Sequence, residues 1–204
     1  MNEINPSEFT AILHELTHHP LPVNKYRPSA GNGISQAFGI VNKRCLPPGP
    51  SRQNWLRPYL YKLLLDFGAK YVDISWNAIT VNQNYKAAPH RDKQNIGDSY
   101  LVAFGDYQGG ELEFHEGEKQ GLHNINCRPI LHNFSKDLHS VKDFTGTRIS
   151  LVYYNFDTRG RTYPPESVQH QDGRWIYIYD GKPITKKEGM PHPLRGRKKV
   201  GHQN

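Results

Sequence analysis

The sequence has little of what marks secreted or membrane-spanning proteins. Only two of its 204 residues are cysteines, Cys45 and Cys127. Two distant cysteines make neither a disulfide framework nor a zinc motif, and so few are typical of a reducing compartment. No run of about 18 apolar residues occurs, so no membrane span is expected. Residues 1–5 also lack the basic-then-apolar order of a signal peptide. We therefore expect an intracellular protein, cytoplasmic, or nuclear if its host is eukaryotic or viral.

Acidic side chains are also fewer than basic ones. The chain has 26 Lys and Arg against 19 Asp and Glu, a net charge of +7. Residues 181–204 hold seven bases and one acid, so this segment carries +6 (7 − 1) and residues 1–180 carry +1 (7 − 6). Such a tail can follow a phosphate backbone, or it can be a solvated end that aids solubility. We expect one domain over residues 1–180 and a flexible basic tail over 181–204.

The N-terminal part, residues 1–70, favours helices. Apolar residues share one face of a helix expected at residues 7–18, and they repeat at three and four across residues 55–67. Gly68 stands where a helix C-terminal glycine is common. A strand is expected at residues 34–41, and the proline-rich residues 47–51 are expected to break the chain before the second helix.

The sequence from residue 71 to 180 is β-rich. Strands are expected at residues 72–81, 100–104, 111–114, 130–134, 139–141, 148–156 and 175–179, with turn signals between them. Several short strands at this spacing predict a mainly β fold, a sandwich, barrel or jelly roll, with flanking helices.

His90 and Asp92 form the first half of a candidate metal site. Alternate residues of an extended segment point to the same side, so these two side chains can reach one ion while Arg91 points elsewhere. Two histidines and one carboxylate form the facial triad of non-haem Fe(II) oxygenases. His139, which follows a turn and opens a β segment, is the best third ligand. His132 is the main rival, and His115 and His123 are weaker ones.

Arg148 and Ser150 point to a second part of the same site. They lie on one face of an apolar strand, and a buried Arg needs an anionic partner. A dicarboxylic cosubstrate would supply one, with Ser150 donating a further hydrogen bond; the alternative is a structural Asp or Glu. Asn82, at the end of a preceding strand, carries an amide that can bind an oxo-acid.

In these motifs the chain resembles the Fe(II)- and 2-oxoglutarate-dependent dioxygenases. His-x-Asp, a Gly-Gly-Glu-Leu hairpin and His followed by Arg-x-Ser carry the resemblance over residues 72–156. Residues 82–99 and 102–112 look most like the TET and J-binding-protein branch, which includes short phage and viral members. The resemblance implies a cupin-like double-stranded β-helix, a jelly-roll form. It also implies that His90, Asp92 and His139 hold Fe(II), that Arg148 anchors 2-oxoglutarate with help from Ser150, and that O2 is consumed.

The same resemblance implies hydroxylation of the methyl group of thymine or 5-methylcytosine in DNA or RNA. The chain lacks the Cys-rich domain of animal TET enzymes, so the core and the basic tail would have to bind the nucleic acid. Candidate contacts to a base or phosphate are Tyr85, Arg91, Lys93, Asn95, Tyr107, His115 and Lys136. Two alternatives stay open: a 2-oxoglutarate-dependent hydroxylase of prolyl, lysyl or other protein side chains, and a non-catalytic jelly-roll module that binds nucleic acid.

Overall fold

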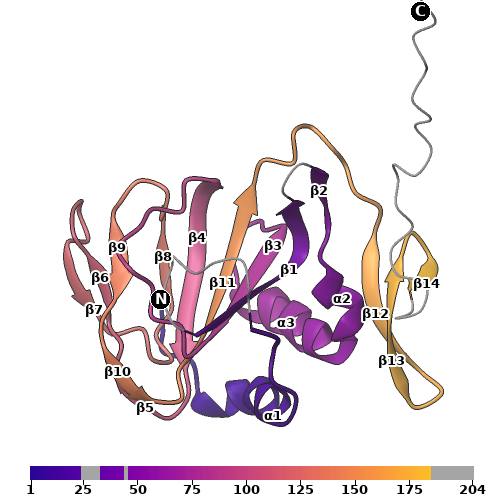
Figure 1. The fold of residues 1–204 in the computed structure, drawn as a ribbon, viewed down its shortest axis with the longest axis horizontal. Helices are drawn as coiled ribbons and strands as arrows, with labels where there is room; N and C mark the ends of the chain where they lie inside the picture. Colours follow the sequence, from indigo (N-terminus) through magenta and orange to yellow (C-terminus); the bar gives the residue numbers. More distant parts are fainter. Residues whose placement is uncertain (24–32, 44–45, 185–204) are drawn as a thin grey trace, which may run out of the picture.

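The computed structural model describes residues 1–23, 33–43 and 46–184, and its largest element is an antiparallel six-stranded sheet (Figure 1). The strand order is β2-β1-β3-β11-β4-β8. The strands are β1 (Ile34–Lys43), β2 (Leu46–Pro50), β3 (Ala78–Gln83), β4 (Asn95–Phe104), β8 (Ile130–His132) and β11 (Ile149–Phe156). β11 lies between β3 and β4, so its residues are flanked on both sides by paired strands.

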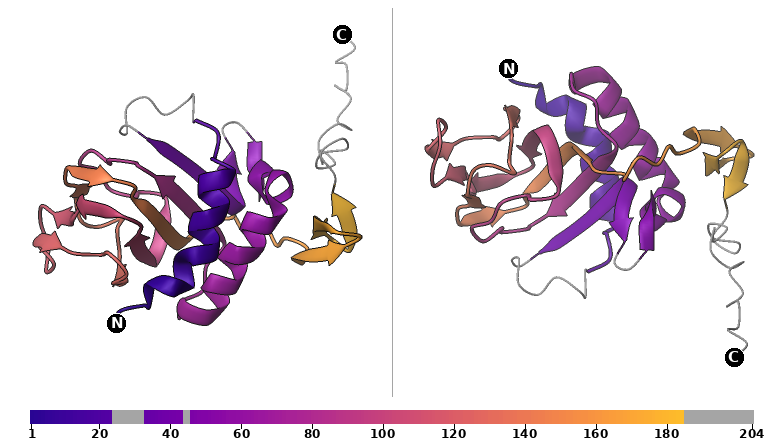
Figure 2. Two further views of the ribbon diagram at one scale, coloured as in Figure 1. Left: turned by 90° about the horizontal axis from the view of Figure 1, so that it is seen from below. Right: turned by 90° about the horizontal axis from the view of Figure 1, so that it is seen from above.

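Helices cover one face of this sheet (Figure 2). After a 3-10 turn, η1 (Pro6–Phe9), the chain forms α1 (Thr10–His18), and later α2 (Arg52–Leu56) and α3 (Pro58–Tyr71). Buried apolar residues of α1 and α3 form one core with inward-facing residues of the sheet. In the described residues no helix has the length and apolar character needed to cross a membrane.

The opposite face of the sheet meets a smaller layer. β6 (Leu112–Phe114) lies between β7 (Gly121–His123) and β9 (His139–Val141), and a short ladder joins β5 (Tyr107–Gly109) to β10 (Phe144–Gly146). Leu101 and Ala103 of β4 pack against Leu112 and Phe114 of β6, which makes a second core between the layers. Two facing antiparallel sheets of this kind form a jelly roll, so the predicted fold class is confirmed.

Three local predictions are wrong. The proline-rich segment does not break the chain but forms β2, where proline is tolerated because an edge strand needs fewer ladder donors. Residues 72–77 precede β3 and are not a strand. Gly68 lies inside α3, where a Cβ atom would come within 2.7 Å of the Trp76 ring, so close packing requires the glycine and not a helix end.

The chain then leaves the main sheet and forms a three-stranded arm. β12 (Glu166–Gln171), β13 (Arg174–Tyr179) and β14 (Lys182–Ile184) make this sheet, which lies beside α2 and α3 (Figure 1). The Glu166 carboxylate accepts hydrogen bonds from the hydroxyls of Tyr61 and Tyr177, the latter at 2.6 Å. The segment expected to be a flexible tail thus begins with an ordered strand, and residues 185–204 lie outside the described residues.

Candidate metal and cosubstrate site

His90, Asp92 and His139 come together in one cleft. The backbones of His90 and His139 pair as an isolated bridge, with N–H to carbonyl distances of 2.9 and 3.0 Å. Possible ligand atoms of the three side chains all lie within 4.8 Å of one another, and Nε2 of His90 is 3.5 Å from Oδ1 of Asp92. Segments about 50 residues apart in sequence are therefore placed so that their side chains can share one ion.

In both histidines Nδ1 is hydrogen-bonded to a backbone carbonyl, so Nε2 is the ring nitrogen available for an ion. Nδ1 of His90 lies 2.8 Å from the carbonyl oxygen of Ala88, and Nδ1 of His139 lies 3.0 Å from that of Asp137. A carbonyl only accepts, so Nδ1 of each ring carries a proton, and in the neutral ring Nε2 is then the nitrogen that can bind a metal. Burial also lowers the pKa of His139, whose exposed fraction is 5%, and this favours the neutral ring that a metal requires.

Asp92 is held by its surroundings in a similar way. Its N–H donates to the carbonyl oxygen of Phe134 at 3.0 Å, and its Oδ2 lies 3.4 Å from the amide nitrogen of Asn95. Oδ1 faces His90. Two imidazole nitrogens and one carboxylate oxygen on one side of an ion match the donor set of non-haem Fe(II) sites. The residues present therefore fit this metal.

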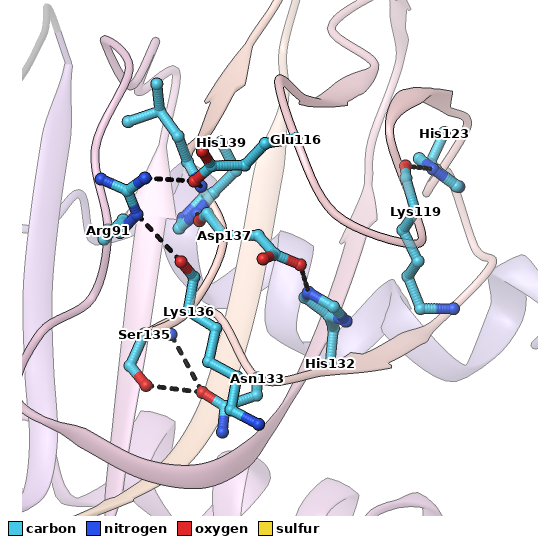
Figure 3. A network of polar contacts seen from close by, with 11 residues as sticks. Arg91, Glu116, Lys119, His123, His132, Asn133, Ser135, Lys136, Asp137 and His139 are labelled. Carbon is cyan, nitrogen blue, oxygen red and sulfur yellow. Dashed lines mark hydrogen bonds and ion pairs between the residues drawn. The ribbon is translucent and has the colours of Figure 1, made fainter.

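The three rival histidines are directed elsewhere. Nε2 of His132 lies 2.8 Å from Oδ2 of Asp137, and that of His123 lies 2.6 Å from the carbonyl of Lys119 (Figure 3). His115 meets the hydroxyl of Ser140 at 2.9 Å. Within the described residues, His90, Asp92 and His139 form the one group of three side chains close enough to hold a metal ion.

Arg148 lines a cleft that His90, Asp92 and His139 also line, and only 2% of its surface is exposed. Its Nε donates to the carbonyl of Gly110 at 3.2 Å, and its guanidinium lies 5.6 Å from the Tyr107 ring centre. Within residues 1–23, 33–43 and 46–184, no carboxylate forms an ion pair with it. Burial lowers its pKa. No structural carboxylate therefore pairs directly with Arg148 in the described residues, although the charge of Glu111 acts on it, and the carboxylate of a ligand would pair with it.

The cleft is about 470 Å³ in volume, and it contains the predicted cosubstrate residues as well as the histidines. Ser150 of β11 and Asn82 of β3 are directly opposite in the ladder, and the Asn82 amide donates to the Ser150 hydroxyl at 3.2 Å. Thr80 and Tyr154, which were not predicted as site residues, line the cleft as well. Their period-two spacing from Asn82 and Ser150 was the available signal.

The predicted substrate contacts divide into two groups. Tyr85, Lys93 and Asn95 line the cleft, whereas Tyr107 and His115 are not among its lining residues. The amide of Asn95 is engaged by Asp92 and Ser99, which favours a supporting role. Arg91 reaches the cleft, but its guanidinium pairs with Glu116 (Figure 3). The backbone carbonyl of Lys136 accepts from Arg91 at 2.9 Å.

Neither a known family model nor a curated protein sequence matches this chain. Solved structures do resemble it. NgTET1 in complex with 5mC DNA has a TM-score of 0.51 and 17% identity, over 74% of this chain and 67% of that one. A 2OG-Fe(II) oxygenase family oxidoreductase from Burkholderia pseudomallei has a TM-score of 0.50 and 15% identity, over 71% and 75%. A Pseudomonas putida prolyl-4-hydroxylase has a TM-score of 0.46 and 11% identity, over 76% and 89%.

These likenesses concern the fold. The chain shares its jelly-roll fold with a 2OG-Fe(II) oxygenase family protein and with a TET protein in complex with DNA.

Proposed function

We propose that this protein is an Fe(II)- and 2-oxoglutarate-dependent dioxygenase that hydroxylates a C–H bond. One observation carries the proposal: a His-Asp-His group and a buried Arg without an acidic partner in the described residues line the same cleft. The first is a donor set for iron, and the second is a receptor for a carboxylate. The oxygenase fold of the chain is consistent with both.

His90, Asp92 and His139 would hold the iron through the two Nε2 atoms and a carboxylate oxygen. Arg148 would bind a carboxylate of 2-oxoglutarate, with Ser150 and Asn82 as hydrogen-bonding neighbours. The bound iron and 2-oxoglutarate would together supply the activation of O2, the oxidant that hydroxylation of an unactivated C–H bond needs.

The protein would contribute orientation and exclusion of water. The carbonyls of Ala88 and Asp137 keep the proton on Nδ1 of each histidine, so both rings stay aimed at the metal. Leu101, Leu112 and Phe134 line the cleft with apolar surface. This surface would strengthen the attraction between Arg148 and a carboxylate by keeping water away.

The substrate we propose is the methyl group of thymine or 5-methylcytosine in nucleic acid. The NgTET1 structure that shares the fold is bound to 5mC DNA. Lys93 and Tyr85 line the cleft, where they can meet a phosphate and stack on a base. Since His139 is buried, a base would have to leave the duplex or come from a single strand to reach it.

The test is incubation of the full chain with Fe(II), ascorbate, 2-oxoglutarate and methylated DNA or RNA, followed by nucleoside mass spectrometry. We expect hydroxymethylated bases from the wild-type protein and none from the His139→Ala variant. Succinate without any oxidised base would contradict the nucleobase substrate and favour a protein side chain. Absence of iron-dependent succinate with every substrate would leave the non-catalytic binding module as the better account.

A further inference from the structure

Arg91 lies in sequence between His90 and Asp92, two of the proposed metal ligands. Its side chain points toward the loop that precedes His139, the third proposed ligand (Figure 3). Its Nε donates to the carbonyl oxygen of Lys136 at 2.9 Å, and its guanidinium forms an ion pair with Glu116. The middle residue of the His-x-Asp motif is therefore tied to the segment that leads into His139.

Glu116 completes this link from the turn after β6. Its Oε1, the oxygen that meets Arg91, also accepts the backbone N–H of Leu138 at 2.7 Å. The N–H of His115 donates to the carbonyl of the same Leu138 at 2.9 Å. Leu138 directly precedes His139, so both polar groups of its backbone are held in place.

The loop at residues 136–138 also sets the ring of His139. The Asp137 carbonyl receives Nδ1–H of His139 at 3.0 Å, and the carbonyl held by Arg91 belongs to the neighbouring Lys136. A shift of this loop would move the acceptor that orients the His139 ring. The contacts of Arg91 therefore affect the orientation of the His139 ring, which Arg91 itself does not touch.

We infer that Arg91 and Glu116 are positioning residues that set the distance between His90–Asp92 and His139, and thereby the affinity for a divalent metal. The inference rests on the proposed function, because it takes these three residues as the ligands. Lone exposed ion pairs contribute little, and these side chains are 37% and 42% exposed. Here, however, the pair is joined to two backbone groups of one short loop, and outer partners of metal ligands typically change affinity by about 10–100-fold.

The direction in which metal affinity changes when Arg91 is replaced distinguishes a positioning role from a purely electrostatic one. Removal of a positive charge near a site for a divalent cation should strengthen cation binding. Loss of a positioning residue should weaken it. Arg91→Met is therefore a discriminating variant. Arg91→Lys keeps the charge but loses the planar fork, so any weakening there reflects geometry.

The experiment is calorimetric titration of Mn(II) into the full chain. We expect the dissociation constant to rise about 10-fold in Arg91→Met and by less in Arg91→Lys. Arg128→Met is the matched control, because Arg128 pairs with Glu3 at 3.2 Å, is exposed, and does not line the cleft. It should bind Mn(II) as the wild-type protein does. Circular dichroism checks that each variant is folded.

Amide hydrogen exchange supplies a readout independent of the metal. The Leu138 amide of the metal-free Arg91→Met protein should exchange faster than in the wild type. Mn(II) affinity equal to or tighter than wild type in Arg91→Met, or equal weakening in Arg128→Met, would overturn the inference. If Arg91→Met does not fold, wild-type affinity and Leu138 protection in Arg91→Lys would overturn it. A wild-type protein that binds no Mn(II) would refute the proposed metal site itself.

Discussion

Gly110 lies directly against Arg148: a Cβ atom on Gly110 would stand 2.9 Å from Cδ and Nε of the Arg148 side chain. The same glycine accepts a hydrogen bond from Nε through its carbonyl oxygen, and its φ is +72°. Gly110 therefore determines where the guanidinium can lie in the cleft.

Gly110→Ala should lower the affinity for 2-oxoglutarate by about tenfold or more, since an Arg148 that shifts cannot form aligned charge-assisted bonds. Calorimetry on the Mn(II)-loaded protein measures this. Gly160→Ala is the control, because its φ is +68° and nothing lies within 4 Å of the added Cβ. The Gly160→Ala variant has an unfavourable positive φ like Gly110→Ala, but its new methyl group touches no other residue. Equal 2-oxoglutarate affinities in the two variants would refute the role of Gly110.

Arg148→Met should weaken the binding of 2-oxoglutarate without lowering the free energy of unfolding. The variant loses the receptor for a carboxylate, and we expect 2-oxoglutarate affinity to fall roughly 10–100-fold, as for a lost charged hydrogen bond of about 1.5–3 kcal/mol. The free energy of unfolding should hold or rise, because the variant no longer buries a charge that has no carboxylate partner in the described residues. Urea denaturation and calorimetry measure the two quantities. A large loss of stability would indicate an ion pair that the described residues do not reveal.

Glu166→Ala should detach the C-terminal arm. The variant leaves the hydroxyls of Tyr61 and Tyr177 without their acceptor, whereas the Asn54 amide, 3.3 Å from Glu166, keeps its bond to the Gly39 carbonyl at 3.1 Å. Each hydroxyl that loses its buried acceptor costs about 1–3 kcal/mol, so the free energy of unfolding should fall by roughly 2–6 kcal/mol. Urea denaturation is the measurement, with exposed Glu118→Ala as the control. Unchanged stability of Glu166→Ala would mean that water replaces the carboxylate.

The sequence was sufficient to predict the β-rich core because the short apolar strands alternate and are bounded by turns. It could also place Arg148 and Ser150 on one face, since alternate residues of an extended segment point to the same side. It could not separate His139 from His132 on spacing alone. That distinction depends on the bridge between His90 and His139, which arises from packing of the two layers.

Contacts across long sequence separations were not predictable in the same way. Arg91 and Glu116 are 25 residues apart, and nothing in either segment reveals that a turn after β6 meets the His-x-Asp motif. Residues 47–50 show a different limit, because proline argues against a strand unless the strand lies at a sheet edge. Edge position is a property of the assembled sheet.

The most direct test of the account is calorimetric binding of 2-oxoglutarate with and without Mn(II), in wild-type protein and in His139→Ala. If the triad and Arg148 form one site, 2-oxoglutarate should bind tightly only to the metal-loaded wild type, and His139→Ala should abolish the dependence on metal. Equal 2-oxoglutarate affinity in all four samples, or no binding in any, would contradict the central claim.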